Sequence, residues 1–191
     1  MDVQPSRHIA PEHDALARRL NRPIVLIGMM GVGKSSVGKR LSMLLGWQFA
    51  DADDEIEKSA QMTIPEIFAT YGEDYFRDGE RRVIARLVSG PDHRIVLATG
   101  GGAFSNPDTR ALILDRAVTV WLDSDLDTLV ERTSRKDNRP LLKDGNAREI
   151  LAKLREERSP QYAQAPIHVL SCSGPHTNTV NKVIQGIEQW L

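Results

Sequence analysis

The sequence predicts an α/β fold in which a parallel five-stranded sheet is covered by helices on both faces. Apolar, β-branched runs alternate along the chain with longer segments whose apolar residues recur at helical spacing. Glycine-rich or acidic segments directly follow the first three of these runs. Parallel strands need right-handed helical crossovers, which cover both faces of the sheet. We therefore expect a three-layer α/β/α sandwich whose ligands gather at the carboxyl ends of the strands.

Each predicted element has its own pattern. The strands are short runs of aliphatic and aromatic residues, predicted at 23–27, 47–50, 94–98, 117–122 and 167–170. The helices have apolar residues three and four apart, predicted at 34–45, 54–60, 64–71, 75–88, 107–114, 125–135, 147–158 and 179–191. Gly72 separates the third and fourth of these helices because glycine weakens a helix interior.

Length and composition predict one soluble domain. The 191 residues suffice for one well-buried core, and we expect a single domain at 23–191 behind a flexible extension at 1–22 that forms a short helix around 15–20. The net charge of −1 argues against nucleic-acid binding, and one cysteine excludes an internal disulfide. No run is long and apolar enough to span a membrane, and no signal peptide is visible. We expect a cytoplasmic monomer.

Residues 28–35 match the phosphate-binding P-loop pattern G-x-x-x-x-G-K-[ST] between a predicted strand and a predicted helix. Such a loop turns its backbone N–H groups toward phosphate oxygens, which needs glycines that tolerate positive φ. Lys34 would reach the β- and γ-phosphates and the Ser35 hydroxyl would hold Mg²⁺. A plain glycine-rich turn is the alternative, and the strand, loop and helix order disfavours it. The prediction is a P-loop sandwich that binds a nucleotide.

Asp51 and Asp53 follow the second predicted strand. Two carboxylates two residues apart point the same way if the extended geometry persists, so both could face one cleft. One would assist Mg²⁺ and the other would be free to take a proton from an attacking hydroxyl. The alternative is an acidic helix start in which Asp53 and Asp54 are plain caps. The neighbouring P-loop favours the functional interpretation.

Gly100, Gly101 and Gly102 follow the third predicted strand, where the lack of side chains would let a ligand approach the backbone. Three arginines are candidates to bind a substrate carboxylate or the transferring phosphoryl group, namely Arg77, Arg139 and Arg158. Glu80 follows Arg77 by three residues, so on a helix it could orient that guanidinium. Any single arginine is more often a solvated surface group.

The combination of these motifs resembles the shikimate kinase family over about residues 24–165. The motifs that carry the resemblance are the P-loop at 28–35, Phe49 to Asp53, Ile64 to Phe68, Gly72-Glu73, Phe76-Arg77 with Glu80, Gly100 to Gly102, Arg139 to Leu142, and Arg158 to Tyr162. The resemblance implies ATP-dependent phosphorylation of the 3-hydroxyl of shikimate, with Mg²⁺, in the pathway to chorismate and the aromatic amino acids.

The resemblance also implies roles. Lys34, Asp53 and Arg139 are the expected catalytic residues, with Arg139 on a mobile lid at about 134–146. The expected ATP-binding residues are Gly31, Val32, Gly33, Lys34, Ser35, Ser36, Arg132 and Arg139, with Arg132 against adenine. The expected substrate-binding residues are Asp53, Arg77, Gly100, Gly101, Gly102 and Arg158, within a helical substrate-binding region at about 53–88 and beyond it. Ser35 and Asp51 are the expected metal ligands. Whether Asp53 removes the proton or only positions the hydroxyl stays open.

The chain departs from the family pattern at its 22-residue leader and at Gln61, where a glycine is common. Two other functions stay open beside the first. One is a different small-molecule kinase of the same fold, acting on gluconate or a nucleoside monophosphate. The other is a nucleotide-binding switch without a small substrate, although the chain lacks the Asn-Lys-x-Asp motif with which GTPases read guanine.

Overall fold

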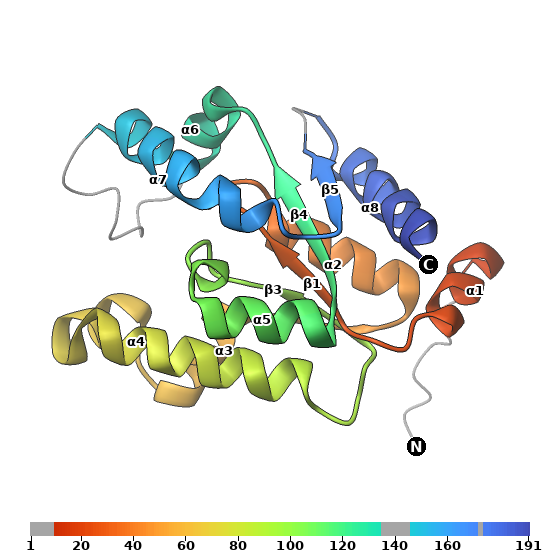
Figure 1. The fold of residues 1–191 in the computed structure, drawn as a ribbon, viewed down its shortest axis with the longest axis horizontal. Helices are drawn as coiled ribbons and strands as arrows, with labels where there is room; N and C mark the ends of the chain where they lie inside the picture. Colours follow the sequence, from red (N-terminus) through yellow and green to blue (C-terminus); the bar gives the residue numbers. More distant parts are fainter. Residues whose placement is uncertain (1–9, 135–145, 172–173) are drawn as a thin grey trace, which may run out of the picture.

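The computed structural model describes residues 10–134, 146–171 and 174–191 (Figure 1). Its centre is a five-stranded sheet with the strand order β2-β3-β1-β4-β5, in which every neighbouring pair is parallel. The strands are β1 (Ile24–Ile27), β2 (Gln48–Asp51), β3 (Ile95–Ala98), β4 (Val118–Asp123) and β5 (Ile167–Leu170). The predicted parallel α/β fold is confirmed, and each predicted strand end lies within one residue of the observed end.

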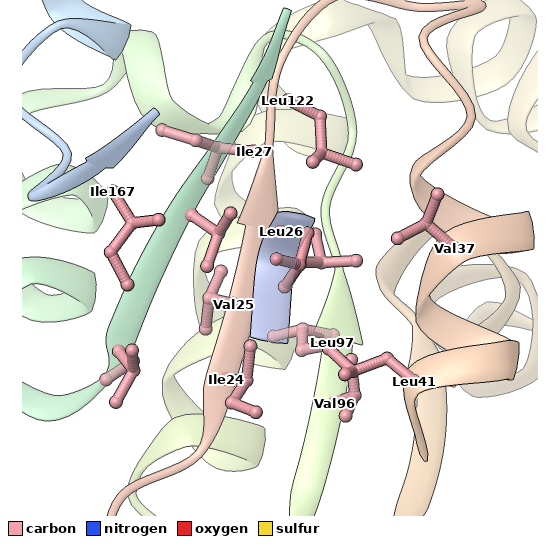
Figure 2. Packing of buried hydrophobic residues seen from close by; sticks show 14 of the residues in the cluster. Ile24, Val25, Leu26, Ile27, Val37, Leu41, Val96, Leu97, Leu122 and Ile167 are labelled. Carbon is pink, nitrogen blue, oxygen red and sulfur yellow. The ribbon is translucent and has the colours of Figure 1, made fainter. Parts of the chain in front are cut away.

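Strand β1 is fully buried because it lies between β3 and β4 and under helices on both faces. Ile24 pairs with Val96 of β3 on one side and with Val118 of β4 on the other. Leu26 of β1 points toward Leu97 and toward Val37 and Leu41 of the following helix, whereas Val25 points to the other side of the strand (Figure 2). The chain continues from β1 toward β2 on one side and later toward β4 on the other. In such sheets this change of direction opens a ligand-binding crevice at the carboxyl end of the central strand.

Helices cover both faces of the sheet (Figure 1). α1, α2 and α8 pack together on one face, and α4 and α5 pack together on the other. Their bounds in chain order are α1 (Pro11–Arg19), α2 (Lys34–Leu45), α3 (Ala52–Ala60), α4 (Ile64–Val88), the 3₁₀ turn η1 (Ala103–Ser105), α5 (Pro107–Arg116), α6 (Leu126–Ser134), α7 (Ala147–Tyr162) and α8 (His176–Trp190).

The leader is better ordered than the sequence analysis predicts. Residues 11–19 form α1, and Leu16, Ala17 and Leu20 are buried in the main core. The expectation of a flexible extension therefore does not hold for this part of the leader. Its apolar residues at helical spacing explain the difference, because they give the short helix a face that packs against α2.

Helices α3 and α4 pack on each other beyond the edge of the sheet and share a small second core around Ile56, Ile67 and Phe76. The predicted break at Gly72 is present as a kink with φ of 82°, across which α4 continues. Thr63 and Glu66 cap the start of α4 reciprocally. This pair of helices carries the predicted substrate-binding region.

Two other helices differ from the prediction. α7 does not end at Arg158 but continues through Pro160 to Tyr162. α8 begins at His176, three residues before the predicted start. The predicted lid spans 134–146, of which 135–145 lie outside the described residues, as does its Arg139. Within the described ranges, no helix is long and apolar enough to cross a membrane.

Candidate active site

A cavity of about 570 Å³ opens at the carboxyl ends of β1, β2 and β3. Its walls combine the P-loop, the acidic start of α3, the glycines after β3, and arginines from three helices. The residues of the sequence prediction that line it are Gly31, Gly33, Lys34, Ser35, Ser36, Asp51, Asp53, Arg77, Gly100, Gly101, Gly102, Arg132 and Arg158. One cavity therefore brings together residues from 31 to 158.

The P-loop has the backbone geometry that phosphate binding requires. Gly31 and Gly33 have φ of 84° and 101°, and Gly33 begins α2 in the left-handed conformation. A β carbon on Gly28 would overlap the carbonyl oxygen of Leu122, so only glycine fits against β4. The Lys34 ammonium donates to the carbonyl oxygens of Gly28 and Met29 at 2.8 and 2.9 Å. The loop thus curls around the lysine.

Asp51 lies against Ser35, the last residue of the P-loop. The Ser35 hydroxyl donates to Oδ2 of Asp51 at 2.5 Å, while Oδ1 of Asp51 accepts the backbone N–H of Asp53 at 3.1 Å. The hydroxyl and carboxylate oxygens are the hard ligands that suit Mg²⁺, which takes one or two protein oxygens beside phosphates and water. The donor set therefore fits the predicted metal.

The predicted geometry of the two aspartates is wrong, although both line the cavity. Extended backbone ends at Asp51, which caps α3, and Ala52 already begins the helix. Asp53 is therefore in the first helical turn rather than on an extended strand end. The cap is Asp51, not Asp53 or Asp54 as the alternative interpretation suggested. The helical turn brings Asp53 toward the third strand.

Asp53 lies in a crowded acidic corner. A β carbon on Gly100 would lie 3.1 Å from Oδ1 of Asp53 and 2.6 Å from Oε1 of Glu80. Burial, helped by the charges of Asp51 and Glu80, raises the pKa of Asp53 to about 6, while Lys34 opposes the shift. Burial also raises the pKa of Glu80. A carboxylate with such a raised pKa at a phosphate-binding loop is a candidate proton acceptor.

Arg77 is held on α4 by two carboxylates. Its Nη1 donates to Glu80 at 3.0 Å, and its Nη2 donates to Glu73 at 3.0 Å. The predicted role of Glu80 in orienting this guanidinium is confirmed by the hydrogen bond. A β carbon on Gly102 would lie 2.8 Å from Nη1 of Arg77. The guanidinium therefore faces the glycine run across the cavity.

Arg158 approaches the same glycine run from α7. Its side chain is buried, and its Nη1 would lie 3.3 Å from a β carbon on Gly101. Within the described part of the chain, Nη1 of Arg158 has no hydrogen-bond partner. A buried cation with an unused donor indicates that an anionic group completes its environment. Arg77 of α4 and Arg158 of α7 therefore both lie against the glycines at 100–102.

The predicted nucleotide residues behave differently from one another. Arg132 lines the cavity and donates to the Val32 carbonyl at 3.1 Å and to the Ser171 hydroxyl at 3.4 Å. Val32 is fully buried and does not line the cavity. Its side chain contributes to the core, so any contact with a nucleotide would come from its backbone.

Among the residues near the site that the predicted set omits, His176 and Tyr162 each lie against one of its glycines. His176 of α8 lines the cavity and lies against Gly33, and burial, helped by the charges of Arg40 and Arg132, lowers its pKa. No local pattern indicates His176, because it precedes the predicted helix. Tyr162 lies beneath the glycine run and donates its hydroxyl to the Gly101 carbonyl. The motif from Arg158 to Tyr162 contains it, but spacing alone gives it no role.

A parallel sheet with a P-loop after β1, beside a cavity that pairs two arginines with a buried carboxylate, defines the protein as a P-loop kinase of small molecules. The family model described as shikimate kinase matches residues 30–188. The chain belongs to the shikimate kinase family.

Relatives match along nearly the whole chain. A shikimate kinase of Novosphingobium aromaticivorans is 64% identical over 182 residues, covering 94% of each chain. One of Caulobacter vibrioides is 53% identical over 176 residues, covering 92% of this chain and 87% of the relative. The solved shikimate kinase of Acinetobacter baumannii in complex with shikimate superposes with a TM-score of 0.84 at 37% identity, covering 88% of this chain and 93% of the other.

The fold is shared more widely. A gluconokinase from Sinorhizobium meliloti superposes with a TM-score of 0.60 at 17% identity, covering 88% of this chain and 93% of the other. This likeness concerns the fold alone. Side chains in the cavity, not the sheet, must therefore distinguish the substrates.

Proposed function

We propose that the protein transfers the γ-phosphoryl group of ATP to the 3-hydroxyl of shikimate, giving shikimate 3-phosphate and ADP on the route to chorismate. The observation that carries the proposal is the convergence of Arg77 and Arg158 on the glycine run, with Asp53 between that run and the P-loop. Shikimate is a ring with one carboxylate and three hydroxyl groups. The two guanidinium groups are complementary in charge to the carboxylate of shikimate, and the Asp53 carboxylate can accept hydrogen bonds from its hydroxyl groups.

In this proposal Arg77 and Arg158 bind the substrate carboxylate. Arginine presents paired donors to a carboxylate, and a buried charge-assisted pair is stronger than an exposed one. The unused donor of buried Arg158 supports the assignment, since a carboxylate would satisfy it. The ring would then extend from the arginines toward Asp53.

Asp53 would accept the hydrogen bond of the reacting hydroxyl. Its pKa of about 6 leaves it mainly ionised at neutral pH and still basic enough to take a proton. Phosphoryl transfer passes through a loose transition state in which positioning matters more than proton removal. Asp53 therefore aligns the hydroxyl with the phosphorus and takes its proton during or after transfer.

The P-loop would hold the phosphates of ATP. Lys34 would exchange its contacts with the Gly28 and Met29 carbonyls for oxygens of the β- and γ-phosphates. Ser35 and Asp51 would hold Mg²⁺, directly and through water. Mg²⁺, when bound, neutralises charge on the β- and γ-phosphate oxygens. Arg139, outside the described residues, and Arg132 complete the proposed ATP-binding set.

An assay of ADP release tests the proposal. Shikimate, gluconate and AMP are offered side by side with ATP and Mg²⁺, and omission of Mg²⁺ tests the metal. Turnover of shikimate well above that of the other two supports the proposal. Turnover of gluconate or AMP without shikimate would reject it. A Lys34→Ala variant is the control that shows the activity belongs to this protein.

The single domain, the monomeric state and the cytoplasmic location expected from the sequence are part of the same proposal. One connected main core supports the single domain. A single cooperative unfolding transition tests the first expectation, light scattering tests the second, and cell fractionation tests the third.

A further inference from the structure

Tyr162 connects α7, the helix that contains Arg158, to the glycines at 100–102 in the cavity wall. It is the last residue of α7 and one of the largest fully buried side chains, with 1% of its surface exposed. Its hydroxyl donates to the carbonyl oxygen of Gly101. The ring packs against Phe104 and Trp121, with centroid distances of 6.4 and 5.9 Å. The tyrosine does not line the cavity, so it acts on a ligand only through its neighbours.

The Gly101–Gly102 peptide lies between the two arginines. A β carbon on Gly101 would lie 3.3 Å from Nη1 of Arg158, and one on Gly102 would lie 2.8 Å from Nη1 of Arg77. The described peptide bonds are all trans. In a trans peptide the carbonyl and the following N–H point in opposite directions. A carbonyl held toward α7 by Tyr162 therefore turns the N–H of Gly102 away from α7.

We infer that Tyr162 is a positioning residue whose hydroxyl holds the Gly101 carbonyl and thereby directs the N–H of Gly102 at the substrate carboxylate between Arg77 and Arg158. The inference rests on the proposed function, because it assigns that carboxylate to this end of the cavity. A carboxylate has about four lone-pair sites on its two oxygens, so it accepts a backbone N–H beside two guanidinium groups.

The glycines explain why the peptide needs an anchor. Glycine adopts many backbone conformations, so a peptide between two glycines can rotate at little cost. A rotated Gly101–Gly102 peptide would present a carbonyl oxygen to the carboxylate and repel it. The Tyr162 hydrogen bond disfavours that rotation. Burial raises the pKa of Tyr162 to about 12, so the hydroxyl stays a donor throughout the neutral range.

Helix α7 carries both Arg158 and Tyr162, and so it positions both the guanidinium and the anchored peptide that are proposed to bind the substrate carboxylate. Arg158 precedes Tyr162 by four residues and therefore lies one turn away on the same face of α7. The guanidinium and the anchored peptide keep a fixed relation because the Tyr162 hydroxyl donates to the Gly101 carbonyl and is also hydrogen-bonded to the side chain of Arg158. Loss of the hydroxyl is then expected to weaken shikimate binding and to leave the nucleotide end unchanged.

The test replaces Tyr162 by phenylalanine, which keeps the ring and removes the hydroxyl. Loss of this one hydrogen bond is expected to raise KM for shikimate about three- to tenfold, measured at saturating ATP. KM for ATP is expected to stay within about twofold of the unaltered value, and kcat to fall less than KM rises. Titration of shikimate by calorimetry gives the same shift without turnover.

Trp121→Phe is the matched control, because Trp121 packs on the same ring without bonding to the hydroxyl. It is expected to lower Tm while KM for shikimate stays unchanged. An unchanged KM for shikimate in Tyr162→Phe would overturn the inference. Equal increases in KM for shikimate and ATP, or an equal increase in Trp121→Phe, would also overturn it, since either indicates general loss of packing.

Amide spectra provide a measurement that does not depend on a folded variant. In the unaltered protein, saturation with shikimate is expected to move the Gly102 amide proton downfield, as a new charge-assisted hydrogen bond does. A Gly102 resonance that does not move overturns the inference even if Tyr162→Phe fails to fold. Turnover of shikimate with a stationary Gly102 resonance rejects only the inference, whereas no turnover at all rejects the proposed function as well.

Discussion

Gly100 and Glu80 lie so close that a β carbon on Gly100 would stand 2.6 Å from Oε1 of Glu80. Glu80 is buried and its other oxygen pairs with Arg77 at 3.0 Å, so it cannot move away without disturbing that guanidinium. The same β carbon would meet Asp53 at 3.1 Å. The lack of a side chain at Gly100 therefore sets the positions of one proposed substrate arginine and of the proposed proton acceptor together.

Gly100→Ala is expected to lower kcat/KM for shikimate by about a hundredfold, because displacement of reacting groups by about 1 Å has an effect of this size. KM for ATP should change little. The control is Gly79→Ala in α4, next to Glu80, where an added β carbon has nothing within 4 Å. The control should keep full activity. Steady-state kinetics of both variants measure the difference. A fully active Gly100→Ala enzyme would show that a β carbon at this position does not displace Glu80 or Asp53.

The pH dependence of activity and of stability should have opposite signs around Asp53. Its pKa is raised by burial to about 6, so the carboxylate forms as pH rises through that value, and kcat/KM is expected to rise with it. The native state binds more protons than the unfolded chain between about pH 4 and pH 6, since a free aspartate titrates near 4. The stabilising contribution is therefore present below about pH 4 and lost as pH rises through about 6.

Asp53→Asn separates this effect from that of Glu80, whose pKa burial also raises. The variant should lose most of its turnover and should bind ATP normally. Its unfolding free energy, from denaturant titrations at several pH values, should fall less between about pH 4 and pH 6 than that of the unaltered protein. If the unfolding free energies of the two proteins change equally with pH, Asp53 is not the titrating group.

The two guanidinium groups can be distinguished from ordinary helix surface charges. Arg158→Ala is expected to raise KM for shikimate at least thirtyfold, which corresponds to about 2 kcal/mol for one partner of a buried charge pair. KM for ATP should rise much less. Arg155→Ala is the control on the same helix, because Arg155 contacts Asp123 at 3.3 Å and does not line the cavity. Similar kinetic effects of both substitutions would count against the carboxylate role of Arg158.

The sheet and the P-loop could be predicted from the sequence because local patterns determine them. An apolar run buried on both faces has the same appearance in the sequence and in the structure, which explains why β1 and β3, both fully buried, match so closely. The P-loop depends on glycine at Gly31 and Gly33, where the backbone has positive φ. Such requirements are visible in eight consecutive residues.

The remaining features depend on contacts between distant segments. The helical position of Asp53 follows from the capping of α3 by Asp51, which competes with continuation of the strand. α7 continues through Pro160 because the carbonyl that loses its partner, on Glu156, belongs to an exposed residue. The contact between Tyr162 and Gly101 joins residues 61 positions apart. No local spacing indicates a contact at that separation.

Gln61 offers a stability test that is independent of the active site. It ends α3 at φ of 52°, and it is the one non-glycine with positive φ in the described part of the chain. A side chain in this conformation is strained by its β carbon, whereas glycine is not. Gln61→Gly should therefore stabilise the protein by about 0.5–1 kcal/mol after the larger entropy of the unfolded glycine chain is included. Gln61 does not line the cavity, so kcat and both KM values should stay unchanged.

Gln61→Ala is the matched control, because alanine keeps the β carbon and should leave stability nearly unaltered. Denaturant titration measures all three proteins, and a glycine variant no more stable than the alanine variant would show that the left-handed residue is not strained.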